Sequence, residues 1–243
     1  MLEKPYYLAY ENRYKTVYEA GGDIWGHSPD DEELTEYLTD WVNKYDLRGK
    51  KIIEFACGEG ASGVILSKLG CIYHGVDISK SAVDKAEYVL KDYPMASVSL
   101  LDMVNEPVKG IYDAALDVMG FHMLVADPDR INYLKNAFSC LKKNANMFFF
   151  RELYEKDAND NFIDSFDEWL LLTNNDYTTP KKMNINKNGK DIEINIPYVP
   201  GRAKTKSGYI REMSEIGFIV DSIIEMNPSY KTSESVSVYI HKP

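Results

Sequence analysis

The sequence predicts an α/β fold built on a doubly wound, mostly parallel sheet of seven strands whose last strand is antiparallel. Two observations lead to this fold. Residues 51–77 read as a short apolar strand, a glycine loop, a helix and a second strand that ends in an acid, which is the order of a βαβ unit. Residues 218–226 and 234–241 read as two strands joined by a reversal at Asn227-Pro-Ser, so they are predicted to pair antiparallel.

The βαβ unit is the most informative stretch. Residues 52–55 supply the apolar run of a parallel strand that is covered on both faces. Gly58, Gly60 and Gly63 follow with G-x-G-x-x-G spacing, which permits a tight turn and a close approach of the backbone to a ligand. Asp77 comes 19 residues after the first glycine, near the roughly 20 at which such a unit presents a carboxylate to a ribose. The unit therefore predicts nucleoside binding.

Two acids beside the glycines narrow the choice of nucleoside. Glu54 precedes the loop and Glu59 lies inside it. A pyrophosphate at the helix N-terminus would be repelled by these carboxylates, whereas a cationic ligand would be attracted. Glu54-x-x-x-Gly-x-Gly resembles motif I of the class I S-adenosylmethionine-dependent methyltransferases, and Val76-Asp-Ile-Ser resembles the acidic motif that follows it. An NAD-linked oxidoreductase remains an alternative, as does a non-catalytic S-adenosylmethionine-binding protein.

The resemblance implies a Rossmann-like sheet, S-adenosylmethionine as cofactor and S-adenosylhomocysteine as product. It also implies that residues following several strands contact the cofactor, with Asp102 at the adenine amino group and Met103 on the ring. The start of the chain is similar to the cap of thiopurine-methyltransferase-like enzymes, in which early aromatic residues close over the cofactor. The expected cofactor-binding residues are Tyr14, Trp25, Glu54, Ala56, Cys57, Gly58, Gly60, Asp77, Ile78, Ser79, Asp102, Met103, Asp117, Val118 and Met119.

Periodicity and capping signals place the other elements. The second helix is expected to have Ser28 as its N-cap and Pro29 at its first position. Gly217 is placed to end the last helix. Helices are predicted over residues 8–20, 29–45, 64–69, 79–93, 129–141 and 207–216, and further strands over residues 71–76, 96–101, 112–118 and 147–150.

Residues 155–206 interrupt this pattern. The segment is longer than a plain connection in a compact α/β unit, so it is expected to have structure of its own. Aromatic residues between positions 162 and 170 predict a short helix, and alternating isoleucines around Asn188-Gly189 predict a hairpin. We interpret the chain as a single domain with a cap (1–46), a cofactor-binding core (47–154), a substrate lid (155–206) and a C-terminal helix with two strands (207–243).

The predicted acceptor is a small, partly aromatic or amphipathic molecule methylated on O, N or S. His122 follows the fourth strand and either takes a proton from the acceptor or orients its loop. Arg202 and Lys204 are interpreted chiefly as solvated surface charges rather than as anion ligands. The expected substrate-binding residues are His122, Arg151, Tyr154, Trp169, Tyr177 and Tyr198.

Composition excludes several classes of function. With 28 Lys and Arg against 38 Asp and Glu, the net charge of −10 disfavours a nucleic-acid partner. Three cysteines without a C-x-x-C motif fit a reducing compartment, and the four histidines show no metal-ligand spacing. The N-terminus lacks a signal-peptide pattern and no apolar run is long enough to span a bilayer, so a cytoplasmic location without a membrane partner is expected.

Overall fold

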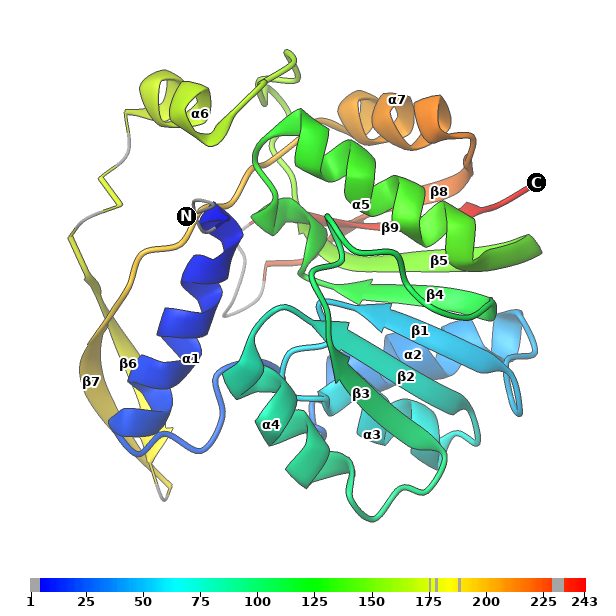
Figure 1. The fold of residues 1–243 in the computed structure, drawn as a ribbon, viewed down its shortest axis with the longest axis horizontal. Coiled ribbons are helices and arrows are strands. Elements are labelled where there is room, and N and C mark those ends of the chain that lie inside the picture. The colour runs from blue at the N-terminus through cyan, green and yellow to red at the C-terminus, as the bar shows by residue number, and fades with distance from the viewer. Residues whose placement is uncertain (1–4, 175, 178, 188, 229–233) are drawn as a thin grey trace.

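The computed structural model describes residues 5–174, 176–177, 179–187, 189–228 and 234–243. Its main sheet has seven strands in the order β3-β2-β1-β4-β5-β9-β8 (Figure 1). The first five strands are parallel, and β9 is antiparallel to both of its neighbours, which confirms the predicted fold class. The strands are β1 (Lys51–Phe55), β2 (Ile72–Asp77), β3 (Ala96–Leu100), β4 (Tyr112–Val118), β5 (Leu141–Leu153), β8 (Ile219–Met226) and β9 (Ser235–His241). Ser229 of the predicted reversal lies outside the described residues.

Helices cover both faces of the sheet. On one face, α2 (Glu32–Lys44) and α3 (Ala61–Lys68) pack through a buried cluster that contains Leu38 and Trp41. On the other face, α5 (Asp127–Cys140) and α7 (Lys206–Ile216) pack through a second cluster. Helix α4 (Lys80–Leu90) follows β2. These two apolar layers fix the strands whose carboxyl ends form the site.

The predicted cap of α2 is wrong. Asp31, not Ser28, is the N-cap, and its carboxylate accepts from the N–H of Leu34 at 3.0 Å. Ser28 instead lies in the preceding turn, where its Oγ accepts from the N–H of Asp30. Both residue types can cap a helix, but a carboxylate also gains from the positive end of the helix dipole.

The N-terminal segment lies beyond the carboxyl ends of the parallel strands (Figure 1). It comprises a 3-10 turn, η1 (Tyr6–Leu8), and α1 (Ala9–Glu19). The predicted hairpin is present as β6 (Lys181–Lys187) and β7 (Lys190–Ile196), with Asn188 of its turn outside the described residues. The hairpin packs on α1 through Val17, Ile185 and Ile196. The short helix of the insertion, α6 (Phe166–Thr173), begins later than the aromatic pattern indicated.

Strand β5 is longer than predicted and contains a bulge that matters for the site. Between Phe149 and Glu152 its pairing with β9 gains one residue, and Arg151 takes a positive φ of 58°. A single extra residue reverses the faces of the residues that follow. Glu152 consequently shares the face of Phe149, toward α5 and α7, and Arg151 points to the opposite face.

Two further features concern the whole chain. Cys57, Cys71 and Cys140 are buried and free of disulfides. Within the described ranges, no helix combines the length and apolar character needed to cross a membrane.

Candidate cofactor and acceptor site

A pocket lies at the carboxyl ends of β1, β2 and β4, beneath the cap. It holds about 520 Å³ of empty space, counting its open mouth. Its described lining contains one acid and no basic residue, and the rest is apolar or tyrosine. The lining residues are Tyr7, Tyr10, Tyr14, Ala56, Asp77, Ile78, Met103, Val104, Gly120, Met123, Leu124 and Tyr133. A pyrophosphate would find no counter-charge here.

Asp77 is the acid of this pocket, as the sequence predicts. Its oxygens accept from the N–H groups of Gly58 and Ser79, each at 2.8 Å. Burial raises the pKa of its carboxyl to about 6, because a charge is costly where little water reaches it. The glycine loop passes close by: a Cβ at Gly58 would lie 2.9 Å from the hydroxyl of Tyr14, and the backbone there has a positive φ.

The end of β3 forms an apolar slot beside Asp77. Met103 is buried, and its Sδ accepts from the N–H of Ala56 at 3.3 Å. Asp102 accepts from the hydroxyl of Tyr7 at 3.2 Å through either oxygen and from Asn105 at 2.9 Å. A planar base in this slot would have the thioether of Met103 beside it.

Glu54 does not line the pocket. Its side chain lies on the face covered by α2 and α3, where the hydroxyl of Tyr73 donates to it. Only 1% of Glu54 is exposed, and burial raises the pKa of its carboxyl to about 8. Odd and even positions of a strand face opposite layers, so Phe55 points to the other cluster. A contact between Glu54 and a cofactor therefore has no support in this geometry.

Glu59 has a role that the sequence did not indicate. Its carboxylate accepts from the N–H groups of Trp25 and Gly26, at 2.9 and 2.5 Å, and from the hydroxyl of Tyr18 at 2.6 Å. Its oxygens are thus occupied by the cap, which corrects the expectation that it attracts a cationic ligand. Trp25 itself packs beside the β6–β7 hairpin, with the guanidinium of Arg13 5.0 Å from its ring.

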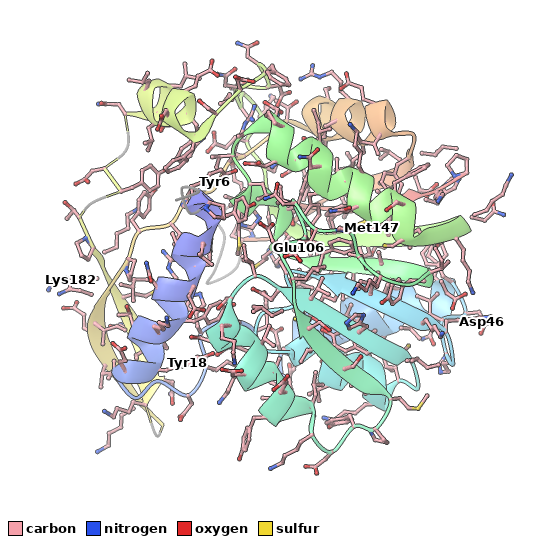
Figure 2. All side chains as sticks on the ribbon, in the orientation of Figure 1. Tyr6, Tyr18, Asp46, Glu106, Met147 and Lys182 are labelled. Atoms are coloured by element: carbon pink, nitrogen blue, oxygen red, sulfur yellow. The ribbon has the colours of Figure 1, made fainter. Side chains whose placement is uncertain are left out.

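A second acid fixes the cap from the other side. Glu11 accepts from Ser79 Oγ at 2.7 Å and from the N–H of Ser81 at 3.0 Å. Its carboxylate therefore sits at the N-terminus of α4, where the helix dipole also favours a negative charge. Burial opposes ionisation, but these hydrogen bonds outweigh it and lower the pKa of Glu11 to about 2. Tyr6 and Tyr18 lie near the two ends of the η1–α1 segment of the cap in Figure 2.

The remaining predicted cofactor residues shape the loops around the pocket. Gly60 is the left-handed N-cap of α3, and Ser79 caps α4 by accepting from the N–H of Ala82. Met119 has a positive φ, and its Sδ lies 3.3 Å from Nε2 of His27. Cys57 and Val118 belong to the cluster beneath α2 and α3.

Buried charged residues lie behind the wall of the pocket near β4. Asp117 accepts from the N–H of Gly120 at 2.7 Å and from the hydroxyl of Tyr133. Glu152 accepts from the N–H of His122 at 2.6 Å and faces its Nδ1 at 3.0 Å. Neither carboxyl group is exposed. A Cβ at Gly120 would meet Asp117 Oδ2 at 2.9 Å, so only the backbone of Gly120 separates this acid from the pocket.

Arg151 does not reach the rim of the site, because the β5 bulge turns it away. It is 1% exposed and donates to Glu33 of α2, with Nε to Oε2 at 2.9 Å. Arg202 and Lys204 are also not surface charges: they are 4% and 2% exposed, and both pair with Asp127. Asp127 offsets the charges of both side chains, which lowers the free-energy cost of burying them.

The aromatic residues of the insertion form a continuous array. Phe166 stacks on Tyr6 of the cap, with ring centroids 4.6 Å apart. Trp169 and Tyr177 follow at 5.0 Å, and Tyr177 stacks on Tyr198 at 4.4 Å. Three predicted substrate residues therefore lie together. The fourth aromatic, Tyr154, is instead bridged to Lys204 and packs on the core beneath α5 and α7.

Early aromatic residues were expected to close over the cofactor, and Tyr7 and Tyr10 line the pocket together with Tyr14. Glu152 was not expected at the site, because its position depends on the bulge, which leaves no signal in the sequence.

A second cavity, between α5 and α7, is lined mostly by groups that already pair with one another. Arg130 pairs there with Glu212 at 2.7 Å, and Lys204 with Asp127. It lies away from Asp77 and the glycine loop.

A family model described as a methyltransferase domain matches residues 52–144, which contain the glycine loop, Asp77 and Asp102. This segment is therefore similar to methyltransferase domains. Solved structures agree on the fold. A structure of an S-adenosylmethionine-dependent methyltransferase from Clostridium acetobutylicum is 12% identical and has a TM-score of 0.64, over 97% of this chain and 98% of that one. The magnesium protoporphyrin IX methyltransferase of Synechocystis, solved with bound S-adenosylmethionine, is 10% identical with a TM-score of 0.65 over the whole of both chains.

A curated relative of this chain is the ribosomal protein L11 methyltransferase of Thermotoga neapolitana. It is 30% identical over 104 residues, which are 41% of this chain. The matched segment spans only 39% of the relative's length.

Proposed function

We propose that the chain is an S-adenosylmethionine-dependent methyltransferase that acts on a small molecule. The observation that carries the proposal is the pocket lining, with a single carboxylate, Asp77, beside an apolar slot and no basic residue. This lining suits a nucleoside with a cationic sulfur and disfavours the pyrophosphate of NAD. S-adenosylmethionine supplies a methyl group on a sulfonium, so the protein chiefly has to position the two reactants.

Each part of the pocket then has a role. Asp77 accepts hydrogen bonds from the ribose diol, and Ile78 and Met103 pack against the adenine ring. Asp102 lies at the edge of that ring, where it accepts from an amino group. The cap covers the cofactor with Tyr7, Tyr10 and Tyr14, and its position depends on Glu11 and Glu59.

The acceptor site is roofed, which supports a small acceptor. Tyr10 lines the pocket and donates to the carbonyl of Pro200, so cap and insertion meet above the strand ends. The stacked Trp169, Tyr177 and Tyr198 continue this roof. Rings with polar tips suit a partly aromatic or amphipathic molecule. Residues 155–206 thus act as a substrate lid on a single methyltransferase domain.

A protein acceptor is the second candidate, because the Thermotoga relative is named for methylation of ribosomal protein L11. Labelled S-adenosylmethionine separates the two. The protein is incubated with a small-molecule extract and, in parallel, with ribosomal proteins. We expect methyl label in the small-molecule extract, and label confined to ribosomal proteins would contradict the proposal.

A further inference from the structure

The β5 bulge places a carboxyl group where the regular strand would have put Arg151. Glu152 is fully buried, and one of its oxygens, Oε2, faces two donors of His122. Its other oxygen, Oε1, has no N–H or hydroxyl donor within the described structure. Burying a carboxylate oxygen without a hydrogen-bond donor costs free energy, so we ask which neighbouring group lowers that cost.

Asp117 provides the explanation. The carboxyl group of Asp117 interacts with that of Glu152, and two acids close together in a dry environment cannot both be ionised. Burial raises the pKa of Asp117 well above its usual range and that of Glu152 to about 7. Asp117 therefore stays protonated, and Glu152 is the member able to gain or lose a proton near neutral pH.

His122 connects this pair to the roof of the site. Its ring is oriented by Glu152 at Nδ1, and its Cδ2 would lie 3.8 Å from a Cβ at Gly201. Tyr10, which lines the pocket, bonds to the adjacent Pro200. Nε2 has no hydrogen-bond partner in the described part of the chain. Burial lowers the pKa of His122 to about 4, so the ring is neutral at pH 7 and Nε2 can accept a proton.

We propose that His122 and Glu152 form a proton relay for the methyl acceptor, and that the acceptor is consequently a hydroxyl. The inference rests on the proposed function. Methyl transfer forms an O–C bond at the acceptor and leaves the electrons of the broken S–C bond on sulfur. The hydroxyl proton goes to Nε2 of His122, and the Nδ1 proton goes to Oε2 of Glu152. His122 ends neutral as its other tautomer, and Glu152 ends protonated. An amine in its neutral form attacks through its own lone pair, whereas a hydroxyl must lose its proton as the O–C bond forms.

The groups around the relay come from every neighbouring element. Tyr10 faces it from α1, Arg130 and Tyr133 from α5, and Tyr209 and Glu212 from α7. Arg130 pairs with Glu212, so the charge at Glu152 is the one that changes with pH near 7.

The direct test reads the tautomer of His122 in the protein saturated with S-adenosylhomocysteine. Nitrogen spectra of ¹⁵N-histidine-labelled protein are recorded from pH 5 to 9, and His122→Gln assigns the signal. We expect a neutral ring with its proton on Nδ1 above pH 7, where Glu152 is ionised. A proton on Nε2 at pH 8 to 9, or a charged ring at pH 6.5, would overturn the relay. This measurement can be made without knowing the methyl acceptor.

Activity supplies a second reading, with labelled S-adenosylmethionine and the small-molecule extract as the probe. Glu152→Gln should lower kcat by roughly 100-fold without changing KM for the cofactor, and should abolish the rise of activity with pH near 7. Glu36→Gln, an exposed acid on α2, is the matched control. Label on an amine or thioether, or full activity of Glu152→Gln, contradicts the relay. A wild-type protein that binds no S-adenosylhomocysteine instead contradicts the proposed function, and the spectra are then recorded on the unliganded protein to decide the relay.

Discussion

Glu59 Oε2, in the middle of the glycine loop, accepts a hydrogen bond from the N–H of Trp25 at 2.9 Å. The glycine loop is thus also the anchor of the cap above the pocket. Gly26 and Tyr18 donate to the same carboxylate. We therefore expect cofactor binding and the position of the cap to be coupled through this side chain.

Glu59→Gln is expected to destabilise the protein by about 1–3 kcal/mol, because all three partners are donors and an amide NH₂ opposes one of them. Urea unfolding measures the loss, and protease cleavage within residues 1–46 should become faster. Glu19→Gln, an exposed acid at the end of α1, is the control. Equal protease resistance of the Glu59 variant and wild type would show that the cap is held elsewhere.

The contribution of Glu11 should depend on pH. Its pKa is lowered from 4.5 to about 2 in the folded protein, so its stabilising effect is present above pH 4.5 and lost as pH falls toward 2. Glu11→Gln should cost about 1–2 kcal/mol at pH 7, and this difference should narrow below pH 4.5 in denaturant titrations. A difference that stays constant down to pH 3 would contradict the assigned ionisation.

Asp77→Asn should weaken binding of S-adenosylhomocysteine by about 2 kcal/mol or more, which is roughly 30-fold, because the ribose diol loses charge-assisted hydrogen bonds. In wild type, affinity should fall as pH drops through about 6, where the carboxyl of Asp77 becomes protonated. Asp84→Asn, on the exposed side of α4, should bind normally. Wild-type affinity in Asp77→Asn would refute the assigned ribose site.

The lid is tested by point substitutions. Deleting residues 155–206 would remove Arg202 and Lys204 and leave Asp127 without its buried partners. The double variant Tyr177→Ala, Tyr198→Ala removes only the stacked pair. It should abolish turnover while S-adenosylhomocysteine still binds. Tyr88→Ala, an exposed residue on α4, is the control, and normal turnover of the double variant would mean that the insertion is not a substrate lid.

The sequence predicted what local patterns determine. Asp77 ends β2 and Met103 lies shortly after β3, and parallel strands end at one edge of a sheet, so their positions in the pocket could be inferred. The antiparallel β9 was likewise visible in the alternation of Val236 and Val238.

Long-range pairing could not be predicted. Glu59 binds Trp25, 34 residues earlier, and Lys204 pairs with Asp127, 77 residues away. The bulge at Arg151 reverses two side chains without any mark in the composition of the strand. Glu152 and the occupied carboxylate of Glu59 are therefore results of the structure alone.

Calorimetric titration with S-adenosylhomocysteine and with NAD tests the central claim most directly. The pocket lining predicts that S-adenosylhomocysteine binds to one site per chain and that NAD does not bind, since no described lining residue can neutralise a pyrophosphate. Binding of NAD without binding of S-adenosylhomocysteine would contradict the methyltransferase account.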